Sequence, residues 1–222
     1  MAYEFDFSVV WDNYGLLLDG ALMTLRLSAL SMIAATIIAL LTLQARSSRV
    51  ALLRWIAIGY IEIIRNTPFL LQLYFFFFGL PSLGVRMSPN TAALVALALN
   101  GGAYAAEIMR GGVASIAKGQ WEAGFALGLR PLQIFRYVIL TPAMRAIYPA
   151  LTSQFILLLL TSSIASAISA SELTAVAQRL DSVTFRSFEI YFAATALYLI
   201  MSSVFTRIFN VLDRILFSYP TR

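Results

Sequence analysis

The stretch GQWEAGFALGLRP, residues 119–131, lies between two long apolar segments and is too polar to cross a membrane itself. The run from Gln120 to Leu127 is rich in helix formers, and Glu122 stands in its expected first turn, where a carboxylate faces the positive end of the helix dipole. Gly128 suits a left-handed C-terminal cap, and Pro131 prevents the helix from continuing. The stretch therefore predicts a helix of about two turns.

A helix this short is marginal in water, so it must pack on something. Trp121 and Phe125 are four residues apart and share one face, which we expect to dock on the protein's own membrane region. Ala123, Gly124 and Ala126 leave the remaining surface small, which favours insertion into a groove of a partner. Spacing alone leaves open a loop that only covers the ends of its own helices.

An amphipathic stretch follows this short helix. Leu132, Phe135 and Ile139 recur at helical spacing, and we expect all three to face the membrane helices.

The composition indicates an integral membrane protein. Of 222 residues, 60% are hydrophobic and 12% are charged, and the mean hydropathy is +0.80. Soluble domains carry about 25% charged residues. A bilayer core of about 30 Å requires about 20 mostly apolar helical residues, and the chain supplies several such runs. We expect one all-α integral membrane domain over residues 1–222, with about five transmembrane helices and a cytoplasmic segment at about 110–145.

The expected crossings are residues 16–43, 55–81, 91–109, 147–168 and 190–211. The second is interrupted, because Pro68 cannot donate a hydrogen bond to the carbonyl of Ile64, so the helix should kink or restart there. We expect Arg65, just before the break, to reach lipid headgroups or to pair with Glu62. Paired glycines at 101 and 102 allow another helix to approach closely. Residues 169–188 predict a small amphipathic helix and turn.

The basic residues predict an orientation. Eleven lie on the side of the first arginine cluster and three on the other: the first set is Arg46, Arg49, Arg54, Arg110, Lys118, Arg130, Arg136, Arg145, Arg207, Arg214 and Arg222, and the second is Arg86, Arg179 and Arg186. The positive-inside rule then places the N-terminus outside and the C-terminus in the cytoplasm. Since the basic residues are dispersed between apolar runs, the net charge of +5 does not indicate a nucleic-acid partner.

Cysteine and histidine are absent from the sequence. This excludes thiolate or imidazole metal sites, His-ligated haem, and Ser-His or Cys-His nucleophile pairs. The phosphate-binding pattern G-x-x-x-x-G-K-[ST] is absent too, and GGVASIAKGQ (111–120) does not supply it. We expect no catalytic residue, metal or cofactor on this chain.

Four stretches, in the proper order, resemble the permease subunits of bacterial type I ABC importers in the polar amino acid branch. EAGFALGLRPLQIFRYVILTPAMRAIYPAL (122–151) resembles the family's EAA loop: Glu122, Ala123 and Gly128 match, Gly124 replaces the usual third alanine, and Pro142 is shifted by one position. EIIRNTPFLLQLYFFFFGLP (62–81) is similar to an Arg-Gly-Thr-Pro segment. NGGAYAAEIMRGGVASIAKGQWEA (100–123) and SASELTAVAQRLDSVTFRSFEIYFAATALYL (169–199) are similar to the lead into that loop and to the outer loop with the last helix.

The resemblance implies a transport subunit, not an enzyme, in the bacterial inner membrane. The short helix between the third and fourth crossings would be a coupling helix held by a pair of ATPase subunits, which bind ATP and Mg. The other implied partners are membrane lipid, a second permease subunit, identical or paralogous, and a periplasmic amino acid binding protein. The implied coupling residues are Gln120, Glu122, Ala123, Gly124, Ala126, Leu127 and Gly128.

Polar residues within the crossings are the candidates for a substrate pathway. Gln154 begins a polar face on the fourth crossing, and in related permeases the matching position contributes to the substrate site. Ser162 and Ser163 continue that face, although hydroxyls also bond back to their own helix. Asn100 and Tyr104, one helical turn apart, either face the same pathway or bond between helices. We expect the nearby Glu107 to form an ion pair with Arg110 or Arg65.

Two other functions compete with the importer. A secondary transporter driven by an ion gradient often shows internal repeats and clustered acids at mid-membrane, and neither is evident in the sequence. A membrane scaffold would move no solute when it is reconstituted with the ATPase and the binding protein.

Overall fold

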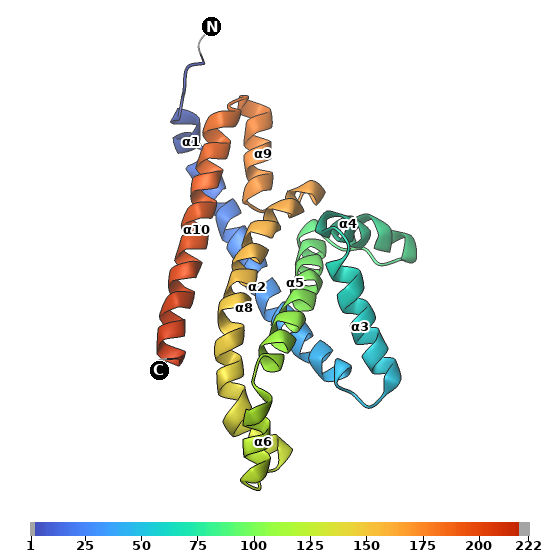
Figure 1. The fold of residues 1–222 in the computed structure, drawn as a ribbon. Helices are drawn as coiled ribbons and strands as arrows, with labels where there is room; N and C mark the ends of the chain where they lie inside the picture. The colour runs from blue at the N-terminus through green and yellow to red at the C-terminus, as the bar shows by residue number, and fades with distance from the viewer. Residues whose placement is uncertain (1–2, 218–222) are drawn as a thin grey trace.

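The computed structural model describes residues 3–217, and every regular element within that range is helical (Figure 1). Four helical runs are long and apolar enough to cross a membrane: α2 (Tyr14–Arg46), α5 (Pro89–Ala114), the continuous run 131–168 and α10 (Ser187–Leu216). A fifth crossing is obtained if the bent pair 51–65 and 69–83 counts as one. This confirms the predicted all-α membrane fold. Arg222, one of the basic residues that predict the orientation, lies outside the described residues.

The long runs are accompanied by shorter elements. The run 131–168 consists of α7 (Pro131–Ile134), a π-helical turn η3 (Phe135–Ile139), α8 (Leu140–Thr161) and a 3-10 segment η4 (Ser162–Ile168). The remaining elements are α1 (Ser8–Asp12), α3 (Ala51–Arg65), α4 (Phe69–Tyr74), η1 (Phe75–Gly79), η2 (Leu80–Leu83), α6 (Lys118–Ala126) and α9 (Leu173–Thr184).

Small residues allow α2 and α5 to pack closely along their length. Ala35 and Ala39 on α2 are fully buried. On α5, a Cβ added at Gly101 would lie 2.6 Å from Leu158 Cδ1 of α8, and one added at Gly102 would lie 2.7 Å from Ile38 Cγ2 of α2. The two glycines therefore permit close approach on two sides of α5, as the sequence predicts.

The break in the second crossing is a sharp bend. α3 and the following helical stretch meet at 112°, and Pro68 stands in the extended conformation immediately before α4. The predicted restart at Thr67-Pro68 is thus confirmed. The carbonyl oxygen of Ile64, which loses its helical donor at Pro68, accepts instead from Nε2 of Gln72 at 2.8 Å.

The predicted amphipathic helix of residues 169–188 is α9. Its N-cap is Glu172, a fully buried carboxylate that accepts from the main-chain N–H of Ala175 at 2.7 Å and of Thr174 at 2.9 Å. The Tyr198 hydroxyl on α10 donates to the same carboxylate at 2.6 Å. A buried side chain therefore ties the start of α9 to α10.

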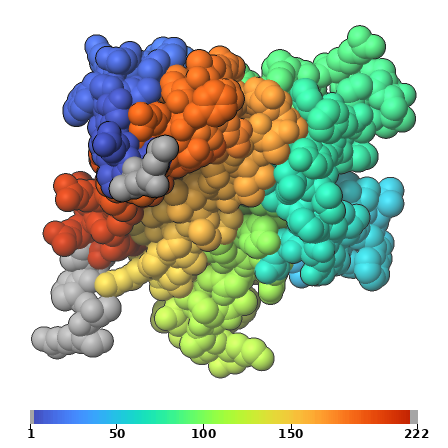
Figure 2. Space-filling model, turned by 90° about the horizontal axis from the view of Figure 1, so that it is seen from above, coloured from blue at the N-terminus to red at the C-terminus, as the bar shows by residue number. Residues whose placement is uncertain are grey.

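The N-terminal segment lies beside the α9–α10 hairpin, on the far side of the molecule from α3 and α4 (Figure 2). The Tyr3 hydroxyl donates to Glu189 Oε2 at 2.5 Å, and the main-chain N–H of Asp6 donates to Glu189 Oε1 at 2.8 Å. The N-terminal segment and α9 thus share one end of the molecule, and α6 stands at the other (Figure 1).

Candidate coupling and transport sites

The short helix predicted between the third and fourth crossings is α6, which projects from the end of the molecule opposite α9 (Figure 1). It begins at Lys118, two residues earlier than predicted, because Ala117 already takes up the extended conformation that precedes it. Glu122 is consequently the fifth residue of the helix, and the expectation that it lies in the first turn is wrong. Glu122 is exposed, and α6 has no side-chain cap hydrogen bond.

The end of α6 has the predicted geometry. Gly128 adopts a φ of 72°, and its N–H donates to the carbonyl of Phe125 at 2.9 Å. The N–H of Leu129 donates back to the carbonyl of Gly124 at 3.1 Å. This pair of bonds forms a Schellman motif, which satisfies two carbonyls at the end of the helix and makes a residue without Cβ favourable at 128.

The inward face of α6 differs from the predicted one. Trp121 is half-buried, but Phe125 is 54% exposed, so the expectation that both dock on the membrane region is wrong for Phe125. The inner contact is made by Gly124, which is buried and where an added Cβ would lie 2.8 Å from Ile134 Cγ1 and 2.9 Å from its Cγ2. Gly124 thus supports α6 from within and is not part of its outer surface.

The other predicted coupling residues lie on the exposed surface of α6 and its cap: Gln120, Glu122, Ala123, Ala126, Leu127 and Gly128. Leu127 has 78% of its surface exposed. The exposed surface of α6 and its cap therefore combines the carboxylate of Glu122 and the apolar side chain of Leu127 with the small residues Ala123 and Ala126.

The π-helical turn after α7 changes which residues face inward. Leu132 is 77% exposed, so its predicted inward position is wrong. Ile134 and Ile139, five residues apart, are both fully buried, because a π-turn brings residues separated by five positions to one face. Phe135 is only half-buried.

Among the predicted pathway residues, Asn100 bonds to another helix. Its Nδ2 donates to Gln72 Oε1 at 3.0 Å. Gln72 is 8% exposed, and its Nε2 donates to Thr67 Oγ1 at 2.9 Å as well as to Ile64 O. Sequence reasoning missed Gln72, although an amide four residues after a proline was a signal, since it can replace the donor that the proline lacks.

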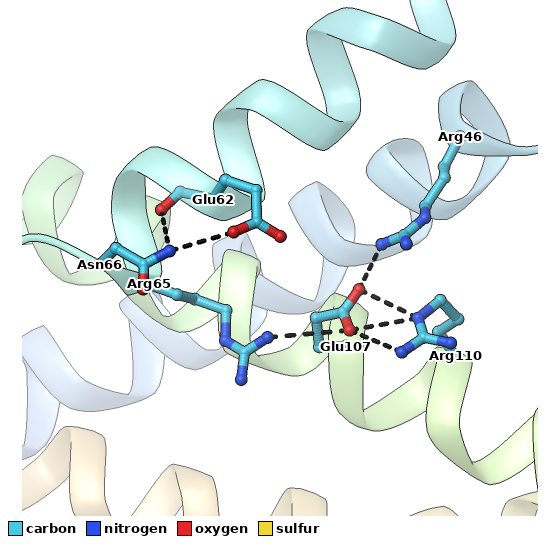
Figure 3. A network of polar contacts seen from close by, with 6 residues as sticks. All are labelled: Arg46, Glu62, Arg65, Asn66, Glu107 and Arg110. Carbon is cyan, nitrogen blue, oxygen red and sulfur yellow. Dashed lines mark hydrogen bonds and ion pairs between the residues drawn. The ribbon is translucent and has the colours of Figure 1, made fainter.

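A charged cluster joins three helices, with Arg46 on α2, Arg65 on α3, and Glu107 and Arg110 on α5 (Figure 3). Tyr104 lies against Arg65 of this cluster. The Arg65 guanidinium carbon is 5.4 Å from the centre of the Tyr104 ring, and Arg65 Nη1 is 3.7 Å from Glu107 Oε2. The expectation that Arg65 pairs with Glu62 is therefore wrong. Glu62 accepts from Asn66 Nδ2 instead, at 3.1 Å.

Glu107 accepts from two further arginines. Arg110 Nη2 donates to Oε2 at 2.8 Å, and Arg46 at the end of α2 donates to Oε1 (Figure 3). Both ion pairs predicted for Glu107, with Arg110 and with Arg65, are present. One carboxylate shared by three guanidinium groups leaves the cluster with an excess of positive charge.

The polar residues of the fourth crossing differ in their hydrogen bonding: the two serines have partners on their own helix, and Gln154 has none within residues 3–217. Ser162 is buried and donates to Leu159 O at 2.6 Å, and Ser163 donates to Leu160 O at 2.7 Å. Both hydroxyls thus bond back to their own helix. Gln154 is half-buried, and within residues 3–217 its amide makes no hydrogen bond. In that same range, no group of three or more acidic residues could hold a metal ion.

The chain is similar to known transport proteins over nearly its whole length. The family described as "Binding-protein-dependent transport system inner membrane component" matches residues 31–217. The glutamine transport system permease protein GlnP of Escherichia coli is 40% identical over 213 residues, which cover 95% of this chain and 97% of that protein. The L-cystine transport system permease protein TcyB of Bacillus subtilis is 38% identical over 221 residues, covering 97% and 94%.

A solved structure agrees with these relatives. One chain of an amino acid ABC transporter crystallised with histidines is 35% identical, with a TM-score of 0.90, and the match covers 96% of this chain and 99% of that one. Chains of the MetNI methionine ABC transporter match at 22% identity with a TM-score of 0.74, which shows a shared fold.

Proposed function

The chain belongs to the family of binding-protein-dependent transport system inner membrane components and is a permease subunit of an amino acid ABC importer. From that premise we propose that α6 is the helix through which a separate ATPase drives transport. Membership implies ATPase and binding-protein partners, so nucleotide binding belongs to another chain, and this chain is a transport component, not an enzyme. Neither the ion-gradient transporter nor the membrane scaffold is favoured.

The single observation that carries the coupling role is the form of α6. A nine-residue helix is too short to be stable alone, yet this one projects from the bundle with an ordered glycine cap and a contact between Gly124 and Ile134. It continues almost directly into α5 on one side and into the run 131–168 on the other. A force on α6 is therefore transmitted to two membrane helices together.

The exposed residues of α6 divide the docking role between them. We assign Glu122 to a basic residue of the ATPase and Leu127 to an apolar groove on it. Gln120, Ala123 and Ala126 complete the surface, where the two small alanines allow close approach, and Gly128 supplies the turn.

We propose that the N-terminus lies in the periplasm and the C-terminus in the cytoplasm of a bacterial inner membrane. The whole of residues 1–222 then forms one permease domain, with residues 110–145 as its cytoplasmic coupling segment. A periplasmic binding protein delivers a polar amino acid at the end that holds α9, and a second permease subunit, identical or paralogous, completes the pathway. ATP and Mg bind the ATPase pair, whose closure moves both coupling helices and opens the pathway outward.

The pathway proposal extends to five residues: Gln154, Ser162, Ser163, Asn100 and Tyr104. Gln154 is the strongest of them because its half-buried amide has no partner among residues 3–217 and can bond to a polar solute. Asn100 and Tyr104 contribute through the network with Gln72 and Arg65.

The test of coupling is Glu122→Arg, with Asp12→Arg as a charge-matched control at the opposite end of the molecule. We expect Glu122→Arg to lose co-purification of the ATPase and ATP-driven uptake in proteoliposomes, while Asp12→Arg retains both. Full ATPase binding and uptake by Glu122→Arg would contradict the assignment.

The orientation has its own test, because the natural chain has no cysteine. In vesicles that contain the permease without its ATPase, a single cysteine at Ala123 should react with a membrane-impermeant maleimide when the vesicles are inside-out and not when they are right-side-out. Reaction only from the outer face would refute the cytoplasmic placement of α6.

A further inference from the structure

An apolar groove of about 300 Å³ lies between α2 and α3, which diverge from the turn that joins them (Figure 1). Its walls include Leu41 and Ala45 of α2 and Leu53 and Ile56 of α3, and Leu99 of α5 lines it as well. The one aromatic hydroxyl in the lining, that of Tyr60, is engaged with Leu99 O at 2.5 Å. The groove therefore offers a hydrocarbon surface and little for a polar ligand to bond.

The groove opens toward the surroundings of the bundle. Leu41 is 60% exposed and Ile56 is 59% exposed, and α2 is one of the apolar membrane-spanning helices. In a membrane these exposed side chains contact lipid tails, so a linear hydrocarbon chain fits the groove without loss of polar contacts.

Three basic residues lie in or next to the α2–α3 turn, close in sequence to residues that line the groove. Arg46 follows Ala45 directly, Arg49 lies in the turn, and Arg54 follows Leu53. Arg49 and Arg54 are both exposed and form no salt bridge with any residue from 3 to 217. Arg46 belongs to the cluster in which three arginines share the carboxylate of Glu107, so it brings the excess positive charge of that cluster close to the turn. A hydrocarbon slot thus ends at uncompensated positive charge.

We propose that this groove binds an anionic phospholipid, with one acyl chain between α2 and α3 and the phosphate held by Arg49 and Arg54. The two parts of the site match the two parts of such a lipid, and basic pockets at the ends of membrane helices attract anionic headgroups. Arginine suits this role because its guanidinium donates two parallel hydrogen bonds to phosphate oxygens. The proposed orientation of the chain decides only which leaflet supplies the lipid.

The headgroup contact is tested on the assembled transporter, purified in detergent with its ATPase. The complex is equilibrated with equal amounts of dioleoyl-phosphatidylglycerol and dioleoyl-phosphatidylcholine, and retained lipids are counted by native mass spectrometry. We expect phosphatidylglycerol to be preferred, and R49Q/R54Q to reduce that preference about fivefold for each arginine. The control R86Q/R179Q removes two exposed arginines at the opposite end and should leave the preference unchanged.

The acyl-chain contact is tested with two neighbouring leucines. Leu53 lines the groove and Leu52 does not, although both are on the exposed side of α3. We expect Leu53→Trp to fill the groove and displace the bound lipid, and Leu52→Trp to retain it. Glycerol phosphate, which carries the anionic group without a chain, should not compete for the site. Retention of the ATPase in every variant shows that the assembly is intact.

Three results would overturn the proposal. The first is an equal loss of preference in R49Q/R54Q and R86Q/R179Q, and the second is displacement of the lipid by glycerol phosphate alone. The third is capture of the second permease subunit by a photocrosslinker at position 53, since a protein chain would then occupy the groove. These outcomes are independent of coupling, because none of the substituted residues lies on α6.

Discussion

The side-chain amide of Gln72 donates to the main-chain carbonyl of Ile64 at 2.8 Å, and Ile64 is the residue whose helical donor would have been Pro68. The same amide nitrogen is 2.9 Å from Thr67 Oγ1, and the amide oxygen accepts from Asn100 at 3.0 Å. One buried side chain therefore completes the hydrogen bonds of the broken helix and attaches the break to α5. The 112° bend is held at a definite angle.

We predict that Gln72→Leu destabilises the protein by about 2–4 kcal/mol, because it leaves the partly buried Ile64 carbonyl and Asn100 amide without their partner. The loss is measured as a drop in the apparent melting temperature of the detergent-solubilised protein. The matched control is Gln44→Leu, which replaces an exposed glutamine on α2 and should change the melting temperature little. Equal effects of the two substitutions would show that the bend does not depend on Gln72.

Gly124→Ala should weaken the docking of α6. Alanine favours a helix over glycine by about 1 kcal/mol, but the new Cβ would lie within 3.0 Å of three carbons of Ile134, and overpacking of this kind costs about 1–3 kcal/mol. We expect less ATPase to co-purify with Gly124→Ala.

Two variants decide whether the contact with Ile134 is responsible. A Cβ added at Gly119 on the same helix would meet no atom within 4 Å, so Gly119→Ala should retain the ATPase. The double variant Gly124→Ala/Ile134→Ala should lose less ATPase binding than the sum of the losses in the two single variants. Additive losses would mean that α6 is supported elsewhere.

The sequence was sufficient where the cause is local. The crossings follow from uninterrupted apolar length, the bend from the missing N–H of Pro68, and the end of α6 from the ability of Gly128 to adopt a positive φ. Each of these depends on a few neighbouring residues.

Features that depend on distant packing were not predictable from spacing. The exposure of Leu132 depends on a π-turn that shifts the helical phase, which a 3.6-residue periodicity does not include. The partner of Arg65 is on α5, 42 positions along the chain, so the nearer Glu62 was the wrong choice. Gly124 was assigned to the outer face because nothing in its own segment indicates that Ile134 packs against it.

Removing the carboxylate of Glu107 should lower the free energy of unfolding more than removing one of the three arginines that share it. Glu107→Gln leaves Arg46, Arg65 and Arg110 close together without a counter-charge, and we expect a loss of about 2 kcal/mol, limited because all three arginines are partly exposed. Arg110→Gln leaves two partners for Glu107 and should cost less than about 1 kcal/mol.

Salt separates this prediction from a simple loss of packing. Added salt screens the repulsion between the three arginines, so it should partly restore the melting temperature of Glu107→Gln. Glu62 is an exposed acid on α3, whereas Glu107 is on α5. The melting temperature of Glu62→Gln should not respond to salt. A melting temperature of Glu107→Gln that does not respond to salt would contradict the electrostatic origin.

Glu172 should make the stability depend on pH. Its burial raises the pKa of the carboxyl above its ordinary value of 4.5, against the hydrogen bonds from Tyr198 and from the N–H groups of Thr174 and Ala175. Well below pH 4.5 the carboxyl is protonated in the folded and the unfolded chain alike. As the pH rises above 4.5 the unfolded chain loses this proton first, so the free energy of unfolding falls until the pH exceeds the folded pKa, and then levels off.

Glu172→Gln removes this proton and keeps an oxygen that can accept from the start of α9. The melting temperature of the wild type relative to Glu172→Gln should therefore fall as the pH is raised from about 4.5, whereas the exposed Glu4→Gln should follow the wild type at every pH. Since both variants retain all other acidic groups, the difference isolates Glu172. A wild type that gains stability relative to Glu172→Gln over this range would instead mean that the three hydrogen bonds outweigh burial and that the folded pKa lies below 4.5.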